Sequence, residues 1–314
     1  MATGRRVLKR WGLRAGQWLL TGLVTWFIVS RVGLGVEELR ALETRTWRPH
    51  PGPFVASVVV LALGYFTSAG IWGRVVRDLG GPSLSTHRAI SIFMVANLGR
   101  YVPGKVWQIA GLAALSRNAG VPVATATAAA VAGQGVALIA AGLLGTITFI
   151  GGPPPYATWG TVALVVLLGL LLLASIPRVY ATVLGAWFRL ARTEEPRALP
   201  RAQVLRWLAL YLLNWLIYAA AFWLLTMSFG LRGSPVAVGS SFAAAYVLGY
   251  VMVFAPAGLG PREGFLIAFL TPQFGGGAAG MIAIVARLWT TLVEVVPAAV
   301  LWMIGRTGRP ERDE

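Results

Sequence analysis

Long apolar stretches separated by short polar loops dominate the chain. The apolar positions are continuous, and they do not alternate as they do in a half-buried strand. Six runs reach the length of about 18 residues that is typical of a membrane-spanning helix. They lie at about 16–34, 54–73, 123–150, 157–177, 204–229 and 278–305. The pattern therefore predicts an all-α polytopic membrane protein with about six spanning helices.

Two further apolar segments are interrupted near their middle by glycine and proline. They cover 88–117 and 237–273. Each arm is too short to cross a bilayer, so each segment is expected to form a re-entrant helical hairpin. Broken backbone at membrane depth is tolerated only where protein or a water-filled cavity surrounds it. The residues expected to act as breaks or hinges are Pro103, Gly104, Pro256, Gly258 and Gly260.

The eight apolar segments repeat the order helix, helix, hairpin, helix. Pro103 precedes Gln134 by 31 positions, and Pro256 precedes Arg287 by 31 as well. With six crossings the two halves have opposite orientations, so they are expected to form an inverted repeat. Paired broken segments in inverted halves are the best sequence pointer to the binding site of a transporter.

The same pattern predicts the domain organisation. The chain is expected to be a single integral membrane domain over 1–314, with pseudo-repeats at about 11–150 and 157–305. The polar residues 306–314 are expected to be a disordered tail.

Charge sets the expected orientation. The chain carries 27 Lys and Arg against 11 Asp and Glu, a formal net charge of +16. The basic residues gather near the N-terminus, in loops expected at 74–88 and 178–206, and in the tail. Such residues mark cytoplasmic loops. Both termini are therefore expected on the cytoplasmic side of the cytoplasmic (inner) membrane.

Composition limits the chemistry. With 57% hydrophobic and 12% charged residues, the chain does not fit a soluble domain. It has no cysteine and two histidines, so thiolate metal sites, disulfides and a Ser-His-Asp relay are excluded. No metal or other cofactor is expected. The chain also lacks RNA- and DNA-binding motifs, so nucleic acid is not an expected partner.

Ionisable residues inside apolar segments are functional candidates, because each costs about 2.5–3.5 kcal/mol on insertion scales. Most of these candidates lie at or beside the two breaks. Asn97 joins them one turn from Arg100, and Gln134 occupies the position that matches Arg287. The expected substrate-binding residues are Arg100, Lys105, Arg262, Arg287, Gln134 and Asn97.

Two acids, Glu263 and Glu294, fall in apolar segments and are candidates for ion pairing or coupling. Glu263 has two interpretations. It is either a structural residue, as a partner of Arg287 or Arg262 or as a carboxylate favoured by the helix N-terminus, or a titrating carrier that couples transport to protons. Because Glu263 lies at the break, we expect it to be the more sensitive of the two acids.

The second arm of the second broken segment opens with Pro261, which suits the first turn of a helix. Its N-terminus, beside Arg262, is expected to form an anion site. Elsewhere Tyr211, Asn214 and Tyr218 form a polar stripe at helical spacing, which favours hydrogen bonding between helices.

The segments from Asn97 to Gln108 and from Pro256 to Gly264 resemble the two signature segments of the flippase-like membrane family, which includes the transmembrane region of lysylphosphatidylglycerol synthases. Ala257 and Pro261 depart from the usual Gly and Val of the second signature. The resemblance covers nearly the whole chain and implies a lipid-translocating or lipid-associated membrane protein. In the synthases, lysine transfer belongs to a separate soluble domain, for which this chain has no room, so we expect that it is not an enzyme.

Three functions remain open. The first is a flippase or transporter for an anionic lipid, either a phospholipid or a polyprenyl-phosphate-linked lipid. The second is a non-catalytic membrane subunit of a cell-envelope pathway, with envelope-biosynthesis enzymes as partners. The third is a membrane transferase that modifies such a lipid; Glu263 and Glu294 are its only candidate acids or bases.

Overall fold

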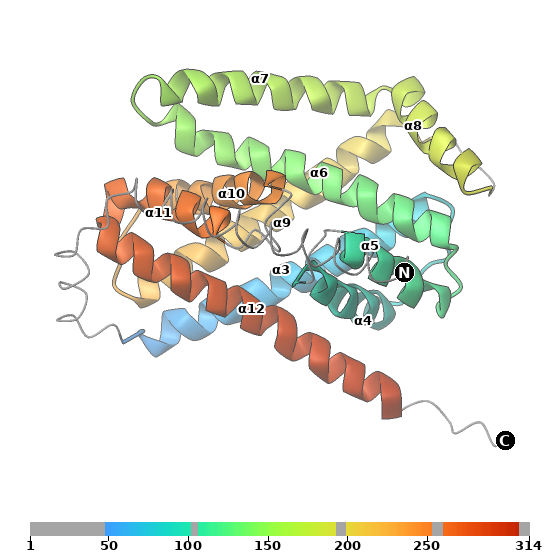
Figure 1. Ribbon diagram of the computed structural model, residues 1–314, viewed down its shortest axis with the longest axis horizontal. Helices are drawn as coiled ribbons and strands as arrows, with labels where there is room; N and C mark the ends of the chain where they lie inside the picture. Colours follow the sequence, from blue (N-terminus) through green and yellow to red (C-terminus); the bar gives the residue numbers. More distant parts are fainter. Residues whose placement is uncertain (1–47, 102–105, 193–198, 253–259, 308–314) are drawn as a thin grey trace, which may run out of the picture.

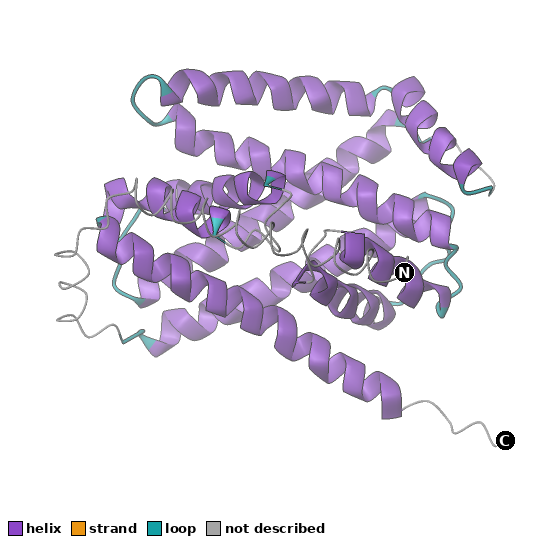
Figure 2. Cartoon of the chain, viewed as in Figure 1, coloured by secondary structure: helices purple, strands orange, loops and turns teal. Residues whose placement is uncertain are grey.

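The computed structural model describes residues 48–101, 106–192, 199–252 and 260–307, and these residues are helical with short connections and no strand (Figure 2). Five helices are long and apolar enough to span a membrane. They are α3 (Pro51–Asp78), α6 (Val123–Ile150), α7 (Tyr156–Ser175), α9 (Arg201–Ser228) and α12 (Gly276–Thr307). The chain is thus a multi-pass helical membrane protein. The five match five of the expected spans, and the sixth, about 16–34, lies outside the described residues.

Shorter helices flank both expected breaks. Around the first lie α4 (Thr86–Asn97), a 3-10 turn η1 (Leu98–Tyr101) and α5 (Val106–Arg117). Around the second lie α10 (Pro235–Val251) and α11 (Pro261–Phe274). Of the expected hinge residues, Pro103, Gly104, Pro256 and Gly258 lie outside the described residues. Gly260 is described, and its φ of 87° is the left-handed conformation that glycine adopts most readily.

The basic loop expected at 178–206 contains a helix instead, α8 (Pro177–Leu190). Leu184 and Phe188 are buried against the protein, whereas Val183 and Leu190 are 66% and 78% exposed. The Trp187 indole N–H donates to the carbonyl of Ala124 in α6 at 3.1 Å. Arginines occupy the remaining face, a distribution typical of a helix at the membrane interface.

The tail also begins later than expected. Helix α12 runs on to Thr307, so it includes the first two residues of the segment expected to be disordered. Residues 308–314 lie outside the described residues.

Helices α3 and α9 pack antiparallel through the centre of the molecule (Figure 1). At one end the backbone N–H of His50 donates to the carbonyl of Ser228 at 2.7 Å. In the middle, the Asn214 amide donates to the Ser68 hydroxyl at 2.8 Å. At the far end the Trp207 indole donates to Asp78 at 2.8 Å. Polar contacts therefore fix the register of two otherwise apolar helices.

The remaining helices pack around this pair in a reciprocal pattern. Helix α4 contacts α3, α5 and α12, and correspondingly α10 contacts α9, α11 and α6. Small residues allow close approach: a Cβ on Gly145 of α6 would lie 2.9 Å from the Cα of Ala244 in α10. Helix α7 lies outside, along α6, and only Gly160 and Ser175 of it are buried (Figure 1). Of the helices that flank the expected breaks, α4 therefore packs against α3 and α10 against α9.

Candidate functional site

Two adjoining cavities lie between the broken segments and the central helices. The larger is lined by residues of α3, α4, η1, α5, α6, α9, α10, α11 and α12, and the smaller by residues of η1, α5, α10, α11 and α12. Their volumes are about 100 and 50 Å³, which is room for several water molecules at about 10–15 Å³ each. Both cavities are lined by Arg100, Gln108, Tyr246, Tyr250, Arg262 and Thr290.

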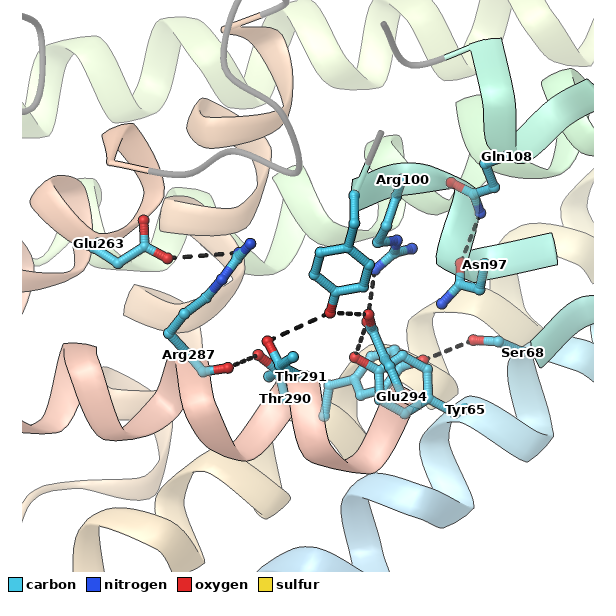
Figure 3. Close-up of polar contacts among 12 residues, drawn as sticks. Tyr65, Ser68, Asn97, Arg100, Gln108, Glu263, Arg287, Thr290, Thr291 and Glu294 are labelled. Carbon is cyan, nitrogen blue, oxygen red and sulfur yellow. Dashed lines mark hydrogen bonds and ion pairs between the residues drawn. The ribbon is translucent and has the colours of Figure 1, made fainter. Parts of the chain in front are cut away.

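Glu294 is the centre of one charged cluster (Figure 3). Its side chain is 3% exposed, and the Arg100 guanidinium donates to its Oε1 at 2.7 Å. The Tyr65 hydroxyl donates to the same oxygen, and the Tyr101 hydroxyl donates to Oε2 at 2.6 Å. The cluster joins α3, η1 and α12. A buried carboxylate requires partners, and these three donors supply them to both oxygens of Glu294.

Glu263 forms a second, looser ion pair with Arg287. Its Oε1 lies 3.6 Å from Arg287 Nη1, and both side chains are partly exposed. Its Oε2 accepts the backbone N–H of Gly260 at 2.7 Å, which caps the N-terminus of α11. Of the two sequence-based interpretations, the geometry matches the structural partner of Arg287.

The capping also changes the expected anion site at the α11 N-terminus. Glu263 itself takes one of the free N–H groups, so the protein's own carboxylate already neutralises part of the positive helix end. The Arg262 side chain, in the first turn of α11, adds a further positive charge at this helix end.

Arg262 lines both cavities. Its guanidinium carbon lies 4.9 Å from the ring centroid of Phe242 and 5.7 Å from that of Tyr246. No described carboxylate forms an ion pair with it. The aromatic faces attract the cation but leave its hydrogen-bond donors unused, so Arg262 is positioned to bind an anion bidentately.

Neutral polar side chains also line the larger cavity. The Gln108 amide donates to Asn97 Oδ1 at 2.8 Å, joining α5 to α4 (Figure 3). Asn214 and the Tyr218 hydroxyl, 2.9 Å from Ser68, link α9 to α3. The expected hydrogen bonding along the polar stripe is confirmed for these two residues. Tyr211 lines the cavity.

The structure brings together five of the six expected substrate-binding residues. Asn97, Arg100, Gln134 and Arg262 line the larger cavity, and Arg287 lines the smaller. Lys105 lies outside the described residues. Sequence reasoning missed Tyr65 and Tyr101, which hold Glu294. A tyrosine within an otherwise apolar helix, as at Tyr65, was a usable signal, because a buried hydroxyl needs a partner.

Together these features define a multi-pass helical membrane protein with a central polar cavity that carries charged residues. Over residues 18–298 the chain matches the model of the lysylphosphatidylglycerol synthase transmembrane region. The chain belongs to this family, whose name connects it with a membrane lipid. No curated protein matches the sequence.

Proposed function

We propose that the protein is a flippase that moves an anionic lipid, a phospholipid or a polyprenyl-phosphate-linked lipid, across the cytoplasmic membrane. The observation that carries this proposal is Arg262. Arg262 is a cation that lines the cavity, and no described carboxylate pairs with it. It lies in the first turn of α11. A phosphate headgroup would supply the missing negative charge.

The contact pattern supports an inverted repeat, with α3, α4, α5 and α6 corresponding to α9, α10, α11 and α12. Under this correspondence the contact of α4 with α12 is matched by that of α10 with α6. The contact of α6 with α9 is likewise matched by that of α12 with α3. The antiparallel α3–α9 pair then lies on the pseudo-two-fold axis. In this architecture the two broken segments re-enter from opposite sides and meet at the transport site.

The distribution of charge supports the orientation. Arginines lie on and around α8, near the end of α3 and in the first turn of α4. With these segments on the cytoplasmic side, both termini are cytoplasmic as well. A single accessibility tag at each terminus tests this arrangement, and termini on opposite sides would exclude it.

We propose transport and not enzymatic modification of the lipid. Glu294 is held by three donors, and Glu263 is used as a cap and ion-pair partner. Both acids therefore already have structural partners, which leaves no described carboxylate in the cavity for acid–base chemistry.

Vesicles containing the purified protein and a labelled anionic lipid test the proposal. Wild-type protein is expected to move the label between leaflets, and Arg262→Ala is expected to abolish the movement while the variant remains folded. The matched control is Arg232→Ala, an exposed arginine in the turn after α9, which should transport normally. Normal transport by Arg262→Ala would place the site elsewhere.

A further inference from the structure

The two cavities differ in the chemistry of their walls, and this difference bears on the headgroup. Among the described residues that line them, Glu294 is the only acid, and both of its carboxylate oxygens accept hydrogen bonds. A cationic headgroup would therefore have to share Glu294 with Arg100, Tyr65 and Tyr101. The charge offered to a ligand is the positive charge of Arg262.

The larger cavity is lined by amides, hydroxyls and aromatic rings. Its neutral polar residues are Ser68, Asn97, Gln108, Gln134, Asn214 and Tyr218, and its aromatic residues include Trp72, Phe93 and Trp215. Amides both donate and accept hydrogen bonds, as sugar and glycerol hydroxyls do. Aromatic rings offer flat apolar surfaces with polar edges. This combination suits a neutral group rich in hydroxyls.

Several of these side chains have unused hydrogen-bonding capacity. Gln134 lines the cavity, and its amide makes no hydrogen bond with another described residue. Asn97 Nδ2, Asn214 Oδ1 and Trp72 Nε1 are buried and lack partners within the described part of the chain. Asn97 and Asn214 are each 1% exposed. Since buried polar groups are nearly always hydrogen-bonded, such a cluster indicates a ligand.

We infer that the headgroup is a phosphate bearing a neutral, hydroxyl-rich group, with the phosphate at Arg262 and the hydroxyl-rich group in the larger cavity beside Gln134. The inference rests on the proposed function, since it takes the cavity as the headgroup site. Its chemistry is common to glycerol in a phospholipid and to a sugar on a polyprenyl phosphate. It excludes a headgroup that carries an amine, despite the family's connection with lysyl esters.

Binding of soluble headgroup probes to the full-length protein in detergent tests the inference without transport. The probes are hexose 1-phosphate, glycerol 3-phosphate, phosphoethanolamine and inorganic phosphate, compared by calorimetry. One or both of the hydroxyl-bearing phosphates are expected to bind at least about tenfold more tightly than inorganic phosphate, the gain that about 1.4 kcal/mol provides. Tighter binding of hexose 1-phosphate would indicate a sugar-bearing lipid, and tighter binding of glycerol 3-phosphate would indicate a glycerol-bearing lipid.

Variants of Gln134 test whether the preference for hydroxyl-bearing phosphates arises in the larger cavity. Gln134→Leu keeps the size of the side chain, and it should remove most of the preference over inorganic phosphate without changing the affinity for inorganic phosphate itself. Gln134→Glu should shift binding several-fold towards phosphoethanolamine, because it adds the missing carboxylate. The matched control is Gln273→Leu, an exposed glutamine that lines neither cavity, and it should leave all affinities unchanged.

Equal binding of inorganic and hydroxyl-bearing phosphates, or tightest binding of phosphoethanolamine to the wild type, would overturn the inference. So would an unchanged preference in Gln134→Leu. Preferential binding without any lipid movement in vesicles would instead overturn the flippase proposal and leave the headgroup assignment in place.

Discussion

The two broken segments face the same cavity but balance their charges differently. In the first, the arginine of the break, Arg100, finds its counter-charge on α12, far along the chain, and the amides Asn97 and Gln108 pair with each other. In the second, Glu263 caps its own helix and pairs with Arg287 of the neighbouring α12. The charge pairing of the first segment thus reaches the other half of the molecule, whereas that of the second segment stays within its own half. Any motion that separates the halves must break the first arrangement and can keep the second.

The largest loss of stability is expected when the ion pair between Arg100 and Glu294, which joins the two halves, is broken. Glu294→Gln leaves Arg100 without its carboxylate, and removing one partner of a buried pair costs about 3–5 kcal/mol. Arg100 is 22% exposed, which favours the lower end of that range. Thermal unfolding of the purified protein, followed by tryptophan fluorescence, measures the loss.

A double-mutant cycle separates the pair from other effects of the change. In Arg100→Gln/Glu294→Gln no charge is left unpaired, so part of the lost stability should return. Additive losses in the double mutant would show that the two residues do not stabilise each other.

An intermediate effect is expected at the amide pair of the first segment. Gln108→Leu leaves the Asn97 carbonyl oxygen buried without its donor, which costs about 1–3 kcal/mol. Gln108→Glu is the informative comparison. It also removes the donor, and in addition it places a carboxylate beside the Asn97 oxygen, which the negative charge would repel. A melting temperature equal to wild type in both variants would mean that this amide contact does not hold α4 against α5.

The smallest effect is expected in the second segment. Glu263→Gln keeps an oxygen that can accept the Gly260 N–H and removes only the charge, at 3.6 Å from a partly exposed Arg287. Pairs of this kind contribute about 1 kcal/mol or less. The sequence-based expectation that Glu263 is more sensitive than Glu294 is thereby replaced by the opposite prediction, which unfolding of the two glutamine variants side by side tests. A larger loss in Glu263→Gln than in Glu294→Gln would reverse the comparison.

Local sequence was sufficient for much of the fold and for the identity of the charged residues. The span at 123–150 was predicted to the residue, because Pro122 and Gly151 flank a continuous apolar run. Burial of Glu294 followed from its place in an apolar helix. Its partner did not, because the contact with Arg100 joins positions 194 residues apart and depends on how the helices pack.

Helix α8 was missed for a different reason. Its arginines and the prolines that follow it are typical of a loop, and the helical spacing of Leu184 and Phe188 is a weaker signal. An amphipathic helix at an interface has low mean hydropathy, so a search for long apolar runs does not find it. Reading the two faces of the segment separately would have identified it.

The charge balance of the cavity has an electrical consequence. Arg100 with Glu294 and Arg287 with Glu263 each sum to zero, so the net charge of this group of residues is that of Arg262. A bound phosphodiester would cancel it. In the proposed flippase, moving the empty site through the membrane field would require about 2.3 kcal/mol per elementary charge for each 100 mV. Moving the loaded site would require no electrical work. The membrane potential would therefore act on the return of the empty protein, and through that step on the direction in which lipid accumulates.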